Sequence, residues 1–262
     1  MNQVSKISGI RWMVVLFFLL TIIMNYIAQI NPFNGQTNGE VSDKYSTLIT
    51  PADYAFSIWG IIYLALGIYV FYQALWAPTE QKVFDKIGKW LIVSFITTSL
   101  WLPAFQYELL GLSVLIMLVI LLSLIMTNII LLKDKTIMGA ERVLLKIPFG
   151  LYLGWISVAT IVNTTVLLKY TTTFFLSASE ILWLWIILAV GFILVILVTK
   201  FSRNVSVSLV FAWAYFAIGN KESQTEDTTT IAIIAAIVLL VVSAIFAFQF
   251  YSTSRKVGFG GR

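Results

Sequence analysis

Apolar stretches of about 20 residues, separated by short polar segments, recur along the whole chain. An α-helix of about 20 residues rises about 30 Å, which matches the hydrocarbon core of a bilayer. The composition agrees, since 60% of the residues are hydrophobic, 11% are charged and the mean hydropathy is +0.93. Backbone amides in hydrocarbon must pair within their own segment, and continuous apolar runs do not suit a barrel. We therefore predict an all-α, polytopic transmembrane helical bundle.

The apolar runs predict about eight spans. The seventh is short for a complete crossing, and a re-entrant segment is the alternative for it. The predicted spans are residues 11–30, 53–76, 88–106, 110–132, 144–168, 180–200, 204–219 and 230–251.

The distribution of Lys and Arg gives an independent check on this count. With eight spans and a cytoplasmic N-terminus, 14 of the 17 basic residues fall in cytoplasmic segments, and only Lys44, Lys169 and Lys221 fall outside. This asymmetry is the positive-inside pattern. It predicts a multi-pass protein of the cell membrane with both termini in the cytoplasm. The pI near 9.3 then reflects contact with the lipid bilayer rather than with nucleic acid.

The residue types that are missing restrict the chemistry. The chain has no His and no Cys, which removes thiolate and imidazole metal sites and the nucleophilic mechanisms that depend on them. Acidic residues such as Asp53, Glu108 and Glu180 lie at predicted span ends, and a proton-driven pump normally needs one inside the membrane. We therefore predict no catalytic residues, no metal site and no resident cofactor.

Two spans carry aromatic residues in helical register. In the second span, Phe56, Trp59 and Tyr63 are spaced i, i+3 and i+7, which places them on one face. In the third span, Trp101 and Phe105 are i, i+4 neighbours. A proline at position 103 frees a backbone carbonyl one turn back and favours a kink.

The fifth span adds a third stripe, formed by Trp155, Ala159 and Asn163. An amide in hydrocarbon must find a partner. Alternating topology places Trp59, Trp101 and Asn163 in the outer half of the membrane and Trp155 deeper. Above them lies the longest polar loop, residues 31–52, which is either a lid or a mobile connector. The stripes either pack helix on helix or line an outward-opening pocket for a small molecule.

These residues resemble the TspO/MBR family of tryptophan-rich sensory proteins, which includes the animal translocator protein. The matching residues are Pro51, Phe56, Trp59 and Tyr63 in span two, Trp101, Pro103 and Phe105 in span three, and Tyr152, Leu153, Trp155 and Asn163 in span five. The resemblance covers about residues 9–169. It implies a TspO-like five-helix core over residues 1–170, followed by a three-helix extension with a short basic tail over residues 171–262.

The resemblance also implies what the protein binds. The expected ligand is a flat hydrophobic small molecule, such as a porphyrin or another tetrapyrrole or a sterol, held between spans two, three and five. The implied ligand-binding residues are Tyr54, Phe56, Trp59, Tyr63, Trp101, Pro103, Phe105, Tyr152, Trp155 and Asn163. Members of the family tend to form homodimers, and Gly150 and Gly154 form a small-xxx-small pair. We interpret that pair as close packing within the bundle.

Five positions depart from the family pattern. Tyr54 replaces a tryptophan, Thr98 an asparagine and Gln106 a phenylalanine, and Thr50 and Leu151 replace prolines. Some members degrade protoporphyrin photochemically, and the change at Tyr54 argues against that activity here.

Two other classes of function fit the sequence. One is a small-solute transporter or exporter, with Pro103 and Gly154 as flexible points. The other is an intramembrane enzyme that uses Asp53 or Glu108 as an acid or base. Flux through proteoliposomes would identify the transporter, and carboxylate-to-amide substitutions would identify the enzyme.

Overall fold

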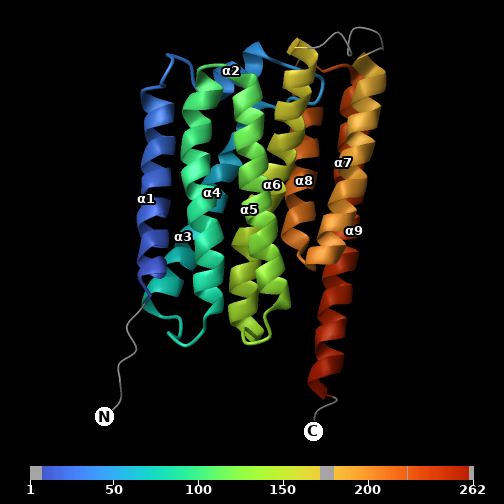
Figure 1. The fold of residues 1–262 in the computed structure, drawn as a ribbon. Coiled ribbons are helices and arrows are strands. Elements are labelled where there is room, and N and C mark those ends of the chain that lie inside the picture. The colour runs from blue at the N-terminus through green and yellow to red at the C-terminus, as the bar shows by residue number, and fades with distance from the viewer. Residues whose placement is uncertain (1–7, 172–179, 223, 260–262) are drawn as a thin grey trace, which may run out of the picture.

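A computed structural model of the chain describes residues 8–171, 180–222 and 224–259. Within these residues the chain is an all-helical bundle whose long helices stand side by side (Figure 1). The elements are α1 (Gly9–Ile30), α2 (Asn38–Lys44), the 3-10 helix η1 (Asp53–Ser57), α3 (Ile58–Leu75), α4 (Val83–Gln106), α5 (Leu110–Lys133), α6 (Gly139–Thr171), α7 (Glu180–Ser202), α8 (Val205–Gly219) and α9 (Glu226–Phe259). The bundle predicted from the apolar runs is confirmed.

The beginning of α1 and the end of α9 lie at the same end of the bundle (Figure 1). We name this the basic end, because the α3–α4 and α5–α6 turns and the helix ends beside them carry lysines and arginines. The opposite end holds residues 31–52 with the short helix α2, and we name it the loop end. Because α1 begins and α9 ends on the same side, the helices between them make an even number of passes.

Seven helices in the described part of the chain are long and apolar enough to cross a membrane. The remaining pass is α8, which has 15 residues and therefore rises only about 22 Å. At the loop end its Ala217 carbonyl accepts a hydrogen bond from the Ala52 N–H. Its N-cap residue, Asn204, instead contacts the Lys146 carbonyl of α6. The segment runs through the bundle in one direction, unlike a re-entrant segment.

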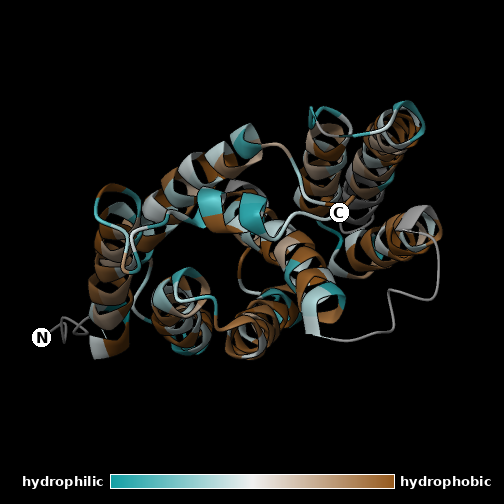
Figure 2. Ribbon diagram, turned by 90° about the horizontal axis from the view of Figure 1, so that it is seen from above, coloured by the Kyte–Doolittle hydropathy of each residue, from teal (hydrophilic) through white to brown (hydrophobic). Residues whose placement is uncertain are grey.

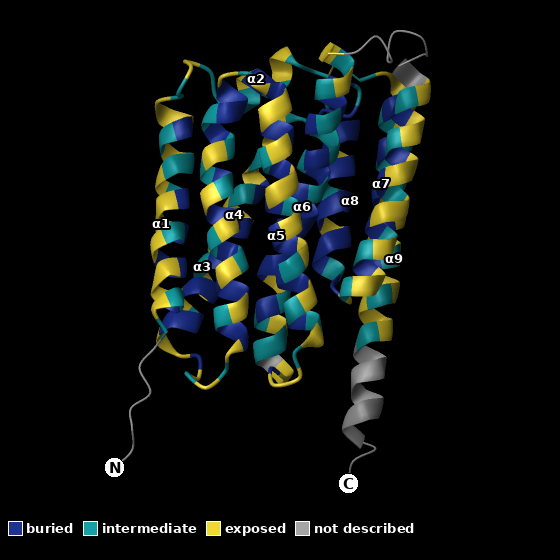
Figure 3. Cartoon of the chain, viewed as in Figure 1, coloured by how far each residue is buried: buried dark blue, intermediate teal, exposed yellow. Residues whose placement is uncertain are grey.

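Large apolar side chains stay exposed on the outward faces of α1, α5, α7 and α9, whereas α8 is mostly buried (Figure 3). Seen from above, hydrophilic segments gather on the connections and hydrophobic residues run along the helices (Figure 2). A helical surface this apolar is solvated by lipid tails and not by water. The arrangement is that of a membrane protein with a lipid-facing ring of helices.

Two arginines close the turns of the basic end. The buried Arg11 guanidinium donates to the carbonyls of Gln73, Ala77, Pro78 and Gln81 and pairs with an Asp85 oxygen at 3.4 Å. It fixes the start of α1 to the α3–α4 turn.

In the α5–α6 turn, the Arg142 guanidinium donates in the same way to four backbone carbonyls, at positions 131, 132, 134 and 137. Both arginines satisfy carbonyls that helix ends leave unpaired.

The glycine pair of α6 faces α8. A Cβ added to Gly150 would meet the Asn204 amide at 2.4 Å, and one added to Gly154 would meet the Val210 Cβ at 2.9 Å. The small residues therefore let two helices of the same chain approach closely, which is the interpretation favoured from the sequence. This stripe is not available for contact with a second copy of the chain.

Candidate functional site

Two adjoining voids lie beneath residues 31–52, and together we name them the aromatic hollow. The upper void measures about 540 Å³, including the part open to the surface, and the lower about 330 Å³. The four residues that line both are Phe56, Trp101, Trp155 and Ala159. The upper void is also lined by Ser42, Tyr45, Pro51, Phe105, Val158, Val162, Asn163 and Val166, and the lower by Trp59, Thr98, Met117, Ile120 and Ile156.

Aromatic rings form the opposing walls of this hollow. On α4, the rings of Trp101 and Phe105 stack 4.8 Å apart at 15°. On the other side, Trp155 meets Phe56 at 6.1 Å and 83° and Trp59 at 6.4 Å and 84°. Edge-to-face and offset-stacked pairs are favourable arrangements for such rings. One wall thus offers ring faces, and the facing rings are held at right angles to one another.

One polar group of the hollow lacks a partner. The Trp101 Nε1 is buried and makes no hydrogen bond within the described residues. A buried N–H without an acceptor costs about 1–3 kcal/mol, so it favours a ligand that carries one. The Asn163 amide at the upper void pairs with the Ser113 hydroxyl of α5 at 3.1 Å. That contact supplies the partner expected for an amide in hydrocarbon.

The start of the second span decides which of its rings enter the hollow. Residues 53–57 form the 3-10 helix η1, and α3 follows from Ile58. With about three residues per turn in a 3-10 helix, side chains two positions apart point about 120° away from one another. Phe56 therefore lines the hollow, while Tyr54 packs edge-on against Trp213 of α8 at 5.5 Å. The Trp213 Nε1 donates to the Ala55 carbonyl and completes this contact.

Six of the ten residues expected to bind ligand line the hollow, namely Phe56, Trp59, Trp101, Phe105, Trp155 and Asn163. The other four lie around it. Tyr54 faces α8 and is 40% exposed, and Pro103 stays within α4 without lining either void.

The last two residues, Tyr63 and Tyr152, pack against Trp59 at the lower end of the hollow. Tyr63 stacks on the Trp59 ring at 5.0 Å, and Tyr152 is fully buried with its ring 5.8 Å from Trp59. The Tyr152 hydroxyl bonds to Thr98 at 2.6 Å, at the position where the family carries asparagine.

The long first loop covers the hollow. We name residues 31–52 the cover, and three of its residues, Ser42, Tyr45 and Pro51, line the upper void. Its helix α2 begins with a capping box, in which the Thr37 hydroxyl accepts from the Glu40 N–H and a Glu40 oxygen accepts from the Thr37 N–H. The segment has its own local structure, as a lid does. Sequence reasoning missed its lining residues because the loop has no apolar period.

Gln106 fixes the beginning of the cover. This buried side chain accepts from the Phe33 N–H at 2.8 Å and donates to the Ala28 carbonyl at 2.9 Å. Its own carbonyl accepts from the Asn34 amide at 3.2 Å. The residue that replaces a family phenylalanine thus joins α1, the cover and α4.

Glu108 fixes the middle of the cover from the α4–α5 turn. Its carboxylate accepts hydrogen bonds from Lys44 Nζ and from the Tyr45 hydroxyl. Those two bonds hold the pKa of Glu108 below its ordinary value. Its backbone is left-handed, with φ of 59°, a conformation that is uncommon for residues other than glycine. The turn therefore presents a carboxylate at the edge of the cover.

The α8–α9 turn fixes the cover from the other side. Lys221 Nζ pairs with an Asp43 oxygen at 2.7 Å, and the Gln224 amide donates to the Leu48 carbonyl at 2.8 Å. The backbone bond from Ala52 to Ala217 adds a third link. Helix α8 and the α8–α9 turn therefore help to hold the cover over a hollow lined by η1, α3, α4, α5 and α6.

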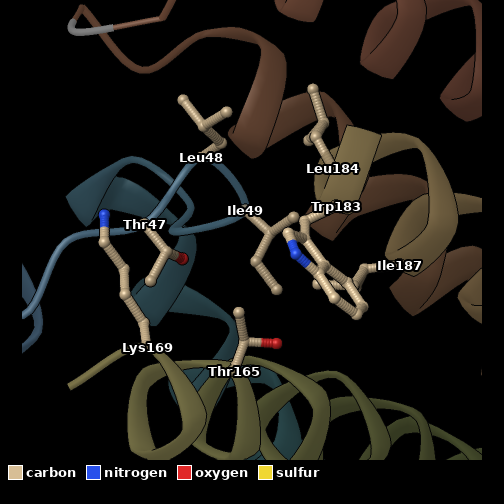
Figure 4. Close-up of a pocket in the computed structure, with 8 residues that line it drawn as sticks. All are labelled: Thr47, Leu48, Ile49, Thr165, Lys169, Trp183, Leu184 and Ile187. Atoms are coloured by element: carbon tan, nitrogen blue, oxygen red, sulfur yellow. The ribbon is translucent and has the colours of Figure 1, made fainter. Parts of the chain in front are cut away.

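A smaller pocket of about 310 Å³ lies beside the cover, between its last residues, α6 and α7 (Figure 4). Ile49 of the cover reaches toward Trp183 of α7, with Ile187 behind them (Figure 4). Lys169 lies at its rim, where Nζ donates to the Ser46 carbonyl. This pocket contains none of the residues predicted from the sequence.

Comparison with known proteins agrees with the resemblance seen in the motifs. Residues 11–247 match a family model described as TSPO-like protein. The match extends beyond the five-helix region covered by the motifs and includes α7, α8 and most of α9. Searches of curated proteins and of solved structures gave no significant match. Because the family model matches most of the chain, the chain belongs to the TSPO-like family.

Proposed function

We propose that this TSPO-like protein binds a flat hydrophobic molecule of the porphyrin class in the aromatic hollow, beneath the cover. The observation that carries the proposal is the buried, unpartnered indole N–H of Trp101, set in a hollow walled by aromatic rings. A conjugated ring can stack on the Trp101–Phe105 face while a polar substituent accepts this N–H. Porphyrins offer both features, and the family resemblance favours them.

The character of the walls supports the proposal. Small-molecule sites are clefts with mostly apolar walls and few polar groups. The upper void has such walls, and the lower void extends it inward. Asn163 sits among the lining residues with one partner, Ser113, and can exchange that bond for a polar group of the ligand.

The position of the hollow favours binding over transport. Below Trp59 and Tyr152 the bundle is filled by fully buried rings, among them Tyr69 and Phe149. A binder or sensor needs only access from the loop end, whereas a carrier needs a second opening. Flux of porphyrin through proteoliposomes at a rate that scales with protein content would support the carrier instead.

The catalytic alternative finds little support in the geometry. Asp53 is exposed at the start of η1, and Glu108 is engaged by Lys44 and Tyr45. Neither carboxylate lines the aromatic hollow.

A cavity-filling substitution tests the binding site. Ala159 lines both voids, so Ala159→Trp places a side chain in the space that they share. We expect the affinity for protoporphyrin, followed by the shift of its Soret absorbance in nanodiscs, to fall about tenfold or more. Ala189→Trp is the matched control, because residue 189 is exposed on α7. Equal affinity for both variants and the wild type would overturn the proposed site.

Truncation of the wall gives a second arm. Trp155→Ala removes a ring that contacts Phe56 and Trp59, and we expect weaker porphyrin binding by the same absorbance assay. Trp185→Ala is the control, since Trp185 is 50% exposed on α7. Reading the ligand's absorbance avoids the loss of protein fluorescence that accompanies any tryptophan substitution.

We also infer that the basic end faces the cytoplasm, because the positive-inside rule places Lys and Arg there. The chain contains no cysteine, so single cysteines can be introduced without background. We expect a membrane-impermeant maleimide applied to intact cells to label Asn38→Cys in α2 and to leave Lys86→Cys in α4 unlabelled. The reverse labelling would contradict this orientation.

A further inference from the structure

The basic end has a recess between α6 and the α7–α8 turn. Because α8 is short and its far end is tied to the cover, the turn stops well before the level of the α5–α6 turn (Figure 1). The α7–α8 turn lies at the level of Lys146 in α6, because the Lys146 carbonyl accepts a hydrogen bond from the Asn204 amide and the Lys146 Nζ donates one to the Arg203 carbonyl. Lys146 lies seven residues into α6 from Gly139, which corresponds to about 10 Å.

An apolar groove leads into this recess from the side of the bundle. It measures about 680 Å³, including the part open to the surface, and lies between α5, α6 and α7. Its apolar lining comes mainly from Ile125, Ile129, Leu132, Leu153, Leu197 and Phe201. We name it the side groove. The polar lining residues Asn128 and Ser202 both direct hydrogen bonds to backbone carbonyls, at Leu124 and Val198. The walls therefore suit a hydrocarbon chain.

Positive charges gather where the side groove ends. Ser202 of the groove is followed by Arg203, and Lys146 precedes the groove residue Leu153 by two helical turns on the same face of α6. Lys200 is exposed on the last turn of α7. Arg142 and Arg203 both lie close enough to Lys146 to act on it electrostatically.

These charges have no acidic counterpart nearby. Arg142 is engaged by backbone carbonyls and lies close to Asp134, whereas no carboxylate pairs with Lys146, Lys200 or Arg203 in the part of the chain that the structure describes. Like charges that crowd at a membrane surface repel one another, and an anion placed among them relieves the repulsion. We name Lys146, Lys200 and Arg203 the basic recess.

We infer that the basic recess binds the phosphate of an anionic phospholipid whose acyl chain lies in the side groove. Basic pockets between transmembrane helices are suited to anionic headgroups, and each Lys or Arg near the surface contributes to the attraction. The apolar stem of Lys146 can extend along the groove while its ammonium group reaches the phosphate. The site lies at the end of the bundle opposite the aromatic hollow and does not depend on the function proposed for it.

The test compares two triple variants. Lys146→Gln, Lys200→Gln and Arg203→Asn together remove the charges of the recess, and asparagine tolerates the φ of 50° at position 203. The control, Lys82→Gln, Lys86→Gln and Lys89→Gln, removes three exposed charges from the same end, away from the groove. Both proteins are purified from membranes that contain phosphatidylglycerol and phosphatidylcholine, and the retained lipid is counted by native mass spectrometry.

We expect the wild type and the control to retain phosphatidylglycerol in preference to phosphatidylcholine, and the recess variant to lose that preference by about tenfold or more. A single variant, Ile129→Trp, fills the groove and leaves every charge in place, and we expect it to reduce retention as well. Equal retention by the recess variant and the wild type would overturn the inference. An equal loss in the control would also overturn it, because general surface charge would then explain the preference. Unchanged retention by Ile129→Trp would refute the place of the acyl chain.

Discussion

At the loop end of the bundle the chain covers its helices with residues 31–52, whereas at the basic end short turns leave a recess open beside α6. The cover is held through neutral and ionic contacts on two sides, by Gln106 and Glu108 and by Lys221 and Gln224. The hollow under it is lined by rings. One end is therefore suited to enclosing a flat apolar molecule, and the other to holding an anion from the membrane surface.

The basic residues at the basic end fall into two groups, those that hold the backbone and those that have no acidic partner. Arg11 and Arg142 each donate to four backbone carbonyls, whereas Lys146, Lys200 and Arg203 have no carboxylate partner in the described residues. All five count equally toward the positive-inside pattern. The pattern thus reports topology, and only the structure shows which charges hold the fold.

The largest effect is expected from removing a structural charge at the basic end. Arg11→Met leaves several buried carbonyls and Asp85 without their partner, and we expect it to lower the free energy of unfolding by about 3–5 kcal/mol. Lys86→Met, at an exposed position of the same end, should change it little. Denaturant unfolding in mixed micelles measures both. Similar stability for the two variants would remove the distinction between structural and available charges.

The next effect concerns the packing that makes the recess. Gly150→Ala would place its Cβ 2.4 Å from the Asn204 amide and force that N-cap away from Lys146. We expect a destabilisation of about 1–3 kcal/mol in the same unfolding assay. Gly60→Ala has no atom within 4 Å of the added Cβ, and it should stabilise α3 by about 0.5–1 kcal/mol. A neutral Gly150→Ala would show that the α7–α8 turn is not held closely on α6.

At the loop end, the effect should appear in kinetics more than in stability. Glu108→Gln removes the charge that holds Lys44 and Tyr45, and we expect the dissociation rate of protoporphyrin to rise about tenfold. Glu222→Gln, an exposed carboxylate of the same end, serves as the control. Stopped-flow displacement of the bound porphyrin measures the rate. An unchanged rate would mean that the cover does not limit escape from the hollow.

The same contact predicts a pH dependence of the cover. Because hydrogen bonds from Lys44 and Tyr45 hold the pKa of Glu108 below its ordinary value, the stability that they add is complete above about pH 4.3 and is lost as the pH falls through the lowered pKa. The hydrogen bond to Glu108 raises the pKa of Lys44. The positive charge of Lys44 is therefore lost only at strongly alkaline pH. Porphyrin dissociation should therefore be constant near neutrality and accelerate in acid, and Glu108→Gln should abolish the acid effect.

The smallest effect is expected from removing the single indole N–H of Trp101 in the hollow. Trp101→Phe keeps a ring on α4 and deletes the unpartnered N–H, so we expect the affinity for protoporphyrin to fall only about threefold. Stability should stay the same or rise, because a buried donor without an acceptor is removed. Absorbance titration and unfolding together measure the two quantities. A loss of stability with unchanged affinity would contradict a ligand role for this N–H.

Hydropathy located the spans well but not their ends. The predicted third span begins at residue 88 and the fifth at residue 144, whereas α4 begins at Val83 and α6 at Gly139. The added turns carry charged residues, such as Asp85, which pairs with Arg11, and Arg142, which donates to backbone carbonyls around the α5–α6 turn. A transfer scale counts these side chains as polar and ends the span too early.

The walls of the hollow followed from helical spacing, since Trp101, Trp155 and Asn163 lie on faces that a period of 3.6 identifies. The position of Tyr54 could not be predicted from helical spacing, because a 3-10 turn and a contact with Trp213 from a distant helix decide its direction. The lining by Ser42 and Tyr45 was equally out of reach, since a loop without a period does not show which side chains face inward. The recess exists because α8 is short. The sequence showed that this span is short, but it did not show that a recess at the basic end follows from it.

The most direct measurement is the position of a bound porphyrin. Zinc protoporphyrin carries a metal that can be located by anomalous diffraction from crystals of the complex. We predict a zinc peak inside the bundle between Trp101 and Trp155, beneath the cover. A peak on the lipid-facing surface, with the rings of the hollow packed on one another and no ligand between them, would contradict the account.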